Sequence, residues 1–217
     1  MTAYRVKRAT ADAAMIILLV TFPHLGLLPM YAFSVLLLLI IWLYLKLWKE
    51  GLAEISFRIT DFKFRCFWLG GLIGLAYAIF AWWIIRPLFD ALGFPPADVS
   101  SFYYIRHNPF NFLVLLVIAG VLVIPFEEIV YRGFILTRVK AMFGNYPHAF
   151  MLSGIITSLI FALYHYQEGW GAVTAIFIGA LFTIWLYKVF KGNLWYLIFF
   201  HFFYDVFMLG AIYLGYN

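Results

Sequence analysis

Six side chains capable of acid–base or electrostatic chemistry lie in hydrophobic stretches of this sequence. They are Glu127, Glu128, Arg132, His165, His201 and Asp205. The first three belong to PFEEIVYRGF, residues 125–134, which follows an almost wholly apolar run, and the others belong to FALYH and HFFYD. Ionisable groups are costly inside a bilayer, so each is a candidate for a functional role. Together they predict a functional site.

Helical spacing gives the two adjacent glutamates different surroundings. At about 100° per residue, Arg132 lies roughly 40° around the helix from Glu128 but about 140° from Glu127. We therefore predict an ion pair between Glu128 and Arg132. Glu127 is left without a counter-ion on its own helix, which suits it to act as a general base. A charge network that only ties helices together is the alternative for this group.

The other candidates differ in how well they are placed to act together. His201 and Asp205 are four residues apart on one helical face, so the carboxylate can orient the imidazole and fix its tautomer. His24, beside Pro23 and near a probable loop, is interpreted as structural. The single cysteine, Cys66, is interpreted as an inert thiol.

Composition indicates the elements that must position these residues. Of 217 residues, 66% are hydrophobic and 12% charged, and the mean hydropathy is +0.96, values typical of a polytopic membrane protein. Spanning segments in lipid must satisfy their own backbone hydrogen bonds, and these apolar runs are too long for barrel strands. We predict an all-α helical bundle, one membrane domain over residues 1–217, with about seven spans: 11–29, 31–48, 67–86, 110–137, 148–166, 172–190 and 194–214.

Charge distribution predicts the orientation of the bundle. With a cytoplasmic N-terminus, only Arg86 and Arg106 among the loop cations fall outside, which agrees with the positive-inside rule. RVKR followed by AMIILLV resembles a signal peptide, but no small-residue cleavage site follows, so we expect a retained anchor. The net charge of +5 lies on the cytoplasmic loops and indicates contact with anionic lipids and no nucleic-acid partner. We expect a multi-pass integral membrane protein, in the plasma or inner membrane if the source is bacterial.

Three ordered motifs resemble those of the CPBP family. EEIVYRG at 127–133, Phe161 with His165, and His201 with Asp205 match the patterns E-E-x-x-x-R, F-x-x-x-H and H-x-x-x-N or D. That family comprises CAAX proteases and bacteriocin-processing or immunity proteins, and includes type II CAAX prenyl endopeptidases. The resemblance covers residues 110–210, which would be a CPBP-like catalytic core.

The resemblance implies an intramembrane endopeptidase built around a polar cavity and acting on membrane-associated peptides or proteins. By analogy, Glu127 is the general base and His165 positions or polarises the water. Glu128 and Arg132 organise the site, while His201 and position 205 face the oxyanion. Prenyl endopeptidases have asparagine where this chain has Asp205, and an ionised carboxylate cannot donate to an oxyanion. Asp205 is then either protonated or orients His201, and we favour the second; a prenylated substrate is a weaker expectation than peptide hydrolysis.

Other chemistries are compatible with the same residues. Zinc held by Glu127, His165 and His201 would also hydrolyse peptides, but no H-E-x-x-H motif is present, and we predict catalysis without a cofactor. A non-catalytic scaffold or bacteriocin-immunity protein is a further alternative. A proton-coupled transporter is disfavoured because no inverted repeat is detectable.

Depth in the membrane sets a condition on the fold. Counted from the predicted inner ends of their helices, His165 lies about 25 Å along and His201 about 12 Å. To share a site, the two histidines must lie at the same depth in the membrane. We therefore expect a tilted helix, or one that begins below the membrane surface.

Overall fold

Helices build all of the regular structure in the computed structural model, which describes residues 3–28 and 31–216. The model is 82% helical, and no strand occurs among the described residues, so the all-α prediction is confirmed. The α-helices are α1 Ala3–Thr21, α2 Ala32–Leu47, α3 Phe64–Phe80, α4 Arg86–Ala91, α5 Pro109–Ile118, α6 Ile124–Glu127, α7 Leu136–Phe143, α8 Ala149–Tyr164, α9 Trp170–Val189 and α10 Leu194–Tyr213. Residue 29, the predicted end of the first span, lies outside the described residues.

Wider π-helical turns join several of these helices into longer rods. Ala81–Ile85 joins α3 to α4, and Ala119–Val123 joins α5 to α6. Each of these turns precedes a proline, Pro87 or Pro125. A proline lacks the backbone N–H and its ring clashes with the carbonyl four residues earlier, so the helix widens just before it. A third π-helical stretch, Glu128–Ile135, joins α6 to α7 and carries most of the first motif.

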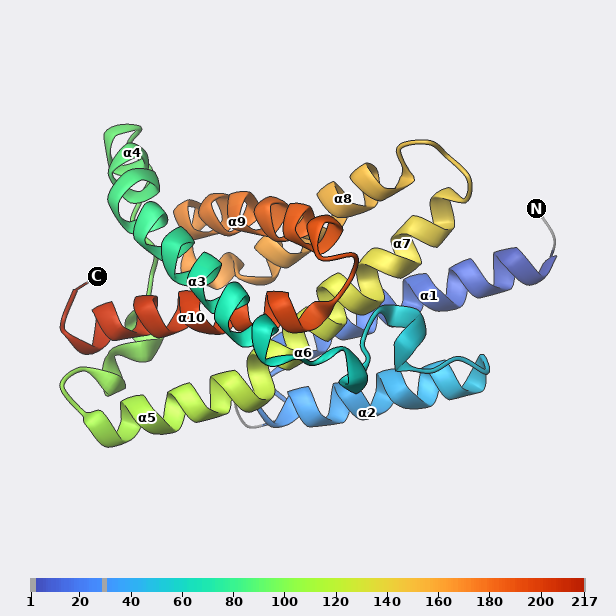
Figure 1. The fold of residues 1–217 in the computed structure, drawn as a ribbon, viewed down its shortest axis with the longest axis horizontal. Coiled ribbons are helices and arrows are strands. Elements are labelled where there is room, and N and C mark those ends of the chain that lie inside the picture. Colours follow the sequence, from blue (N-terminus) through green and yellow to red (C-terminus); the bar gives the residue numbers. More distant parts are fainter. Residues whose placement is uncertain (1–2, 29–30, 217) are drawn as a thin grey trace.

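Among the described residues, five helical segments are long and apolar enough to cross a membrane. They are Val6–Leu25, Phe64–Ala91, Pro109–Phe143, Trp170–Val189 and Leu194–Tyr213. The other two predicted spans correspond to α2 and α8, of 16 residues each, or about 24 Å, which is shorter than a hydrocarbon core of about 30 Å. The polytopic helical prediction is therefore confirmed, while the count of seven crossings stays a prediction. Figure 1 shows the N- and C-termini at opposite ends of the long axis.

Some predicted boundaries were wrong. The helix predicted over 110–137 continues to Phe143, and the one predicted over 67–86 continues to Ala91. The outer loop predicted over 87–109 is correspondingly shorter and contains a 3-10 helix, Ser100–Ile105.

Small residues let α3 and α10 pack closely. A Cβ atom on Gly74 would lie 2.1 Å from the backbone oxygen of Phe200, and one on Gly70 would lie 2.5 Å from that of Tyr196. Further along, Tyr77 contacts Tyr204 and Trp82 contacts Phe207. The contacts advance in the same direction on both helices, so α3 and α10 run parallel and end on the same side.

A second charge cluster, which the sequence reasoning missed, ties α1 and α7 to the end of α2. Asp12 is 3% exposed and accepts hydrogen bonds from Arg8 at 3.1 Å and from the Tyr44 hydroxyl at 2.7 Å. Arg138 lies 3.7 Å from Asp12 and also pairs with Glu50. Arg138 directly follows the span predicted over 110–137, which would place it in a cytoplasmic loop, but it lies in α7 and is buried, because its partners neutralise it there.

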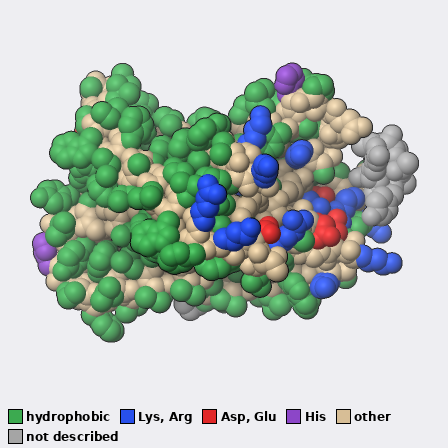
Figure 2. All heavy atoms as spheres, viewed as in Figure 1, with side chains coloured by type: hydrophobic (Ala, Val, Ile, Leu, Met, Phe, Trp, Pro, Cys, Tyr) green, Lys and Arg blue, Asp and Glu red, His purple; other side chains and the backbone are tan. Residues whose placement is uncertain are grey.

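Charged side chains are distributed unevenly along the long axis. Figure 2 shows lysine, arginine and acidic side chains gathered on the half of this face that contains the N-terminus, while the other half is predominantly hydrophobic. This asymmetry is the pattern on which the predicted orientation rests. The orientation itself stays a prediction.

Candidate active site

The site begins at a contact between two helices far apart in sequence. His201 of α10 has its Nδ1 2.9 Å from Oε1 of Glu128, which lies in the π-helical stretch after α6. The same Oε1 lies 3.3 Å from an Arg132 nitrogen, so the predicted Glu128–Arg132 ion pair is present. Glu128 is fully buried and Arg132 is 3% exposed. One carboxylate thus holds both the guanidinium and the imidazole in place.

Arg132 is fixed by two further contacts. Its Nε and Nη2 donate hydrogen bonds to the Thr183 hydroxyl of α9, at 3.2 and 2.9 Å. The guanidinium also lies over the Phe161 ring of α8, 4.2 Å from the ring centroid. Sequence reasoning missed Thr183, because a threonine in an apolar helix carries no signal of its partner. These contacts connect the first motif to α8 and α9.

Glu127 differs from its neighbour, as its helical position indicated. Its Oε2 lies 3.8 Å from Nε2 of His201, and no hydrogen bond to Glu127 is present among the described residues. The residue is 8% exposed. Glu127 is therefore buried beside an imidazole while its carboxylate stays available to another molecule.

Asp205 lies on the other side of the same imidazole nitrogen. Its Oδ2 is 3.7 Å from His201 Nε2, and its side chain is 28% exposed. We expected Asp205 to orient His201, but the closer partner is Glu128, which contacts the opposite ring nitrogen. His201 consequently faces three carboxylates, with Nε2 between Glu127 and Asp205.

His165 is the residue that follows the last residue of α8, and it contacts the other motifs through Phe161. Its Nδ1 lies 2.9 Å from the Phe161 backbone oxygen. The Phe161 ring packs edge-on against His165 at 4.9 Å and against His201 at 6.3 Å between centroids. Both histidines therefore lie against the same phenylalanine ring. Figure 1 shows the α7–α8 turn projecting further along the long axis than the α9–α10 turn. A helix that begins below the membrane surface stays a prediction.

His24 packs at the edge of this region. Its ring contacts Tyr164 at 4.8 Å and Tyr166 at 5.5 Å between centroids. No hydrogen bond or ion pair of its side chain is present in the described part of the chain, and the structural interpretation of this residue stays a prediction.

Glu168, between α8 and α9, is an additional acidic group that the sequence reasoning missed. Burial, together with the nearby carboxylates of Asp205 and Asp98, raises its pKa to about 7. The Asp98 backbone N–H donates to the Glu168 carbonyl oxygen at 2.9 Å. This contact holds the outer loop against the segment that follows His165.

The side chains do not assemble a ready metal centre in this arrangement. Within residues 3–28 and 31–216, no three histidine, cysteine, aspartate or glutamate side chains form a group that could hold a metal ion. His201 Nδ1 is also committed to Glu128. The set Glu127, His165 and His201 therefore does not fit a zinc ion without rearrangement, and catalysis without a metal stays a prediction.

The fold and the cluster define a class of protein: a polytopic helical membrane protein with a buried Glu–Arg–His site joining four helices. Residues 109–207 match the family of type II CAAX prenyl endopeptidases described as Rce1-like. The match over this segment confirms the resemblance that the three motifs predict. It supports a CAAX-type intramembrane protease. Comparisons with curated proteins and with solved structures give no match.

Proposed function

We propose that this protein is an intramembrane endopeptidase that hydrolyses peptide bonds of membrane-associated substrates with a water activated by Glu127. The observation that carries this proposal is the difference between the two adjacent glutamates. Glu128 is paired with Arg132 and His201, whereas Glu127 is buried without a hydrogen bond among the described residues. A purely structural ion network has little use for a buried carboxylate left in that state.

The reaction follows from the roles open to each group. Glu127 accepts a proton from the attacking water, whose oxygen bonds to the scissile carbonyl carbon. When the tetrahedral intermediate collapses, the carbon–nitrogen bond breaks and Glu127 returns the proton to the leaving amine. His165 helps to position the water. No cofactor is needed for this sequence of steps.

His201 supplies the donor for the oxyanion. Nδ1 donates to Glu128, so Nε2 can donate as well only when the ring is an imidazolium. Three carboxylates compensate that positive charge. A fixed N–H in a water-poor site then stabilises the developing negative charge. Arg132 acts indirectly, by fixing the carboxylate that orients His201.

The substrate is expected to reach the site from the membrane. Asp205 and His201 are the more exposed members of the cluster, with side chains 28% and 17% exposed. Their side of the cluster is therefore the proposed point of entry for a peptide bond. Membrane lipids are the surrounding partner, and the proposed orientation keeps the N-terminus in the cytoplasm.

The decisive experiment compares Glu127→Gln with the wild-type protein on a fluorogenic peptide library, after purification and reconstitution in lipid. We expect Glu127→Gln to abolish cleavage, since an amide cannot accept the water proton. Glu54→Gln, in an exposed turn, is the matched control and keeps full activity. A strong chelator is added in parallel and is expected to have no effect.

Two results contradict the proposal. Cleavage by Glu127→Gln at the wild-type rate removes Glu127 from the mechanism. Loss of activity with the chelator, restored by zinc, replaces glutamate catalysis with a metal mechanism.

A further inference from the structure

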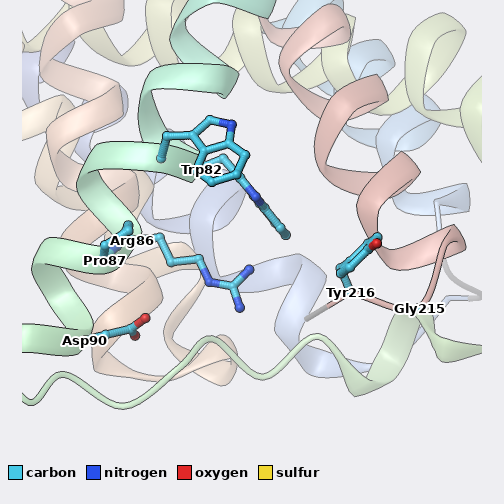
Figure 3. Close-up of a pocket in the computed structure, with 7 residues that line it drawn as sticks. Trp82, Arg86, Pro87, Asp90, Gly215 and Tyr216 are labelled. Carbon is cyan, nitrogen blue, oxygen red and sulfur yellow. The ribbon is translucent and has the colours of Figure 1, made fainter.

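A pocket with opposite charges lies at the end of α3 and α10, lined by none of the six candidate site residues. Its volume is 460 Å³, within the range of small-ligand sites. The lining residues are Trp82, Trp83, Arg86, Pro87, Asp90, Gly215 and Tyr216. Figure 3 shows the Arg86 side chain extending below Trp82 toward Tyr216, with Asp90 on the same side of the helix.

The helices create this pocket by separating after a close contact. Gly70 and Gly74 bring α3 against α10 near the beginning of both helices. The π-helical turn Ala81–Ile85 then widens the helix. The Trp82 ring contacts the rings of Phe207 and Tyr216, at 6.1 and 6.5 Å between centroids. Space remains beyond these rings. Such π-helical turns are frequent at functional sites.

The pocket lies at the depth of a lipid headgroup. Arg86 is 22 residues beyond Phe64 on one rod, a distance of about 33 Å, close to the thickness of a hydrocarbon core. Gly215 and Tyr216 directly follow α10, a candidate span that ends at Tyr213. Tryptophan and tyrosine prefer this interface, as do arginines whose stems lie in the apolar layer.

The two charged side chains of the pocket have no partner of opposite charge among the described residues. Arg86 stacks over the Trp82 ring, 4.4 Å from the ring centroid, but the side chains of Arg86 and Asp90 make no hydrogen bond or ion pair within the described part of the chain. They are four residues apart on one helix, yet they do not pair with each other. Separate cationic and anionic groups in one pocket match a ligand that carries both charges.

We propose that this pocket binds the headgroup of an aminophospholipid, with the lipid phosphate on Arg86 and the primary ammonium on Asp90. A guanidinium binds phosphate oxygens through charge-assisted hydrogen bonds. Asp90 accepts hydrogen bonds from the ammonium, and the tryptophan faces provide a wall that favours a cation. The acyl chains follow the apolar surface of α3.

The test is native mass spectrometry of the full chain in mild detergent. The protein is titrated separately with phosphatidylethanolamine, phosphatidylcholine, phosphatidylglycerol and inorganic phosphate. We expect one tightly bound phosphatidylethanolamine. Arg86→Gln is expected to weaken it at least about tenfold, because a hydrogen bond to a charged group is lost. Arg65→Gln, exposed at the other end of the same rod, is the matched control and keeps wild-type binding.

A second variant tests the ammonium contact and guards against a folding defect in the first. Asp90→Asn is expected to keep phosphatidylglycerol binding and to lose the preference for phosphatidylethanolamine over it. Equal phosphatidylethanolamine binding by wild type and Arg86→Gln overturns the proposal. Binding of inorganic phosphate as tight as that of the lipid also overturns the proposal, because it indicates a simple anion site. The experiment measures lipid retention, so its result does not depend on whether the protein is a protease.

Discussion

His201 Nδ1 lies 2.9 Å from Glu128 Oε1, although 73 residues separate the two in sequence. This contact brings the first and third motifs into one site and leaves Nε2 of the ring facing Glu127 and Asp205. The orientation of the imidazole therefore depends on a glutamate of another helix and not on the aspartate one turn away.

Glu128→Gln is predicted to cost both stability and activity. An amide cannot neutralise Arg132 and His201, and breaking a buried ion pair from one side costs about 3–5 kcal/mol. Thermal unfolding followed by circular dichroism should show a clear fall in Tm, and cleavage should fall at least about a hundredfold, the usual loss for a misoriented oxyanion donor. Glu54→Gln provides the matched control. An unchanged Tm with normal cleavage contradicts the proposed role of Glu128.

Asp205→Asn is predicted to retain cleavage within about tenfold, because an amide at this position can itself donate to an oxyanion. Asp205→Leu can neither donate nor compensate the His201 charge, so its activity should fall about a hundredfold. Both variants are assayed on the same peptide. If Asp205→Asn is as inactive as Asp205→Leu, the negative charge of Asp205 is itself required.

Gly74→Ala is predicted to destabilise the protein by about 1–3 kcal/mol, the usual cost of overpacking. The added methyl group would lie 2.1 Å from the Phe200 backbone oxygen, so α3 and α10 must separate. The measurement is thermal unfolding in detergent. Gly210→Ala is the control, because nothing lies within 4 Å of a Cβ there, and it should be neutral or slightly stabilising. Equal Tm values for the two variants contradict the close packing.

Glu168→Gln is predicted to stabilise the protein at alkaline pH but not at acidic pH. The pKa of Glu168 is raised to about 7 from an ordinary value of 4.5. Stability from the protonated carboxyl is fully present below pH 4.5 and is lost as pH rises through 7. The neutral amide escapes this loss, so the variant should have the higher Tm at pH 8 and a similar Tm at pH 4.5. A difference that does not depend on pH contradicts this assignment.

The sequence by itself determined the solvent, the secondary structure and the members of the candidate site. Long apolar runs require helices in lipid, and the rarity of charge within those runs isolates the polar residues. The Glu128–Arg132 pair was also predictable, because residues four apart on a helix are neighbours whatever surrounds them. The motifs indicated the family before any contact was known.

Only the tertiary structure decided which side chains meet across helices. The Arg132–Thr183 hydrogen bond joins residues 51 apart, and the Arg138–Glu50 pair joins residues 88 apart. Neither follows from helical periodicity, which states which residues share a face but not which helix covers that face. The same limit applies to His201, because the sequence offered Asp205 as an orienting carboxylate but could not show that Glu128 lies closer. Helix packing set those partners, because close contacts such as those at Gly74 fix where each helix meets its neighbour.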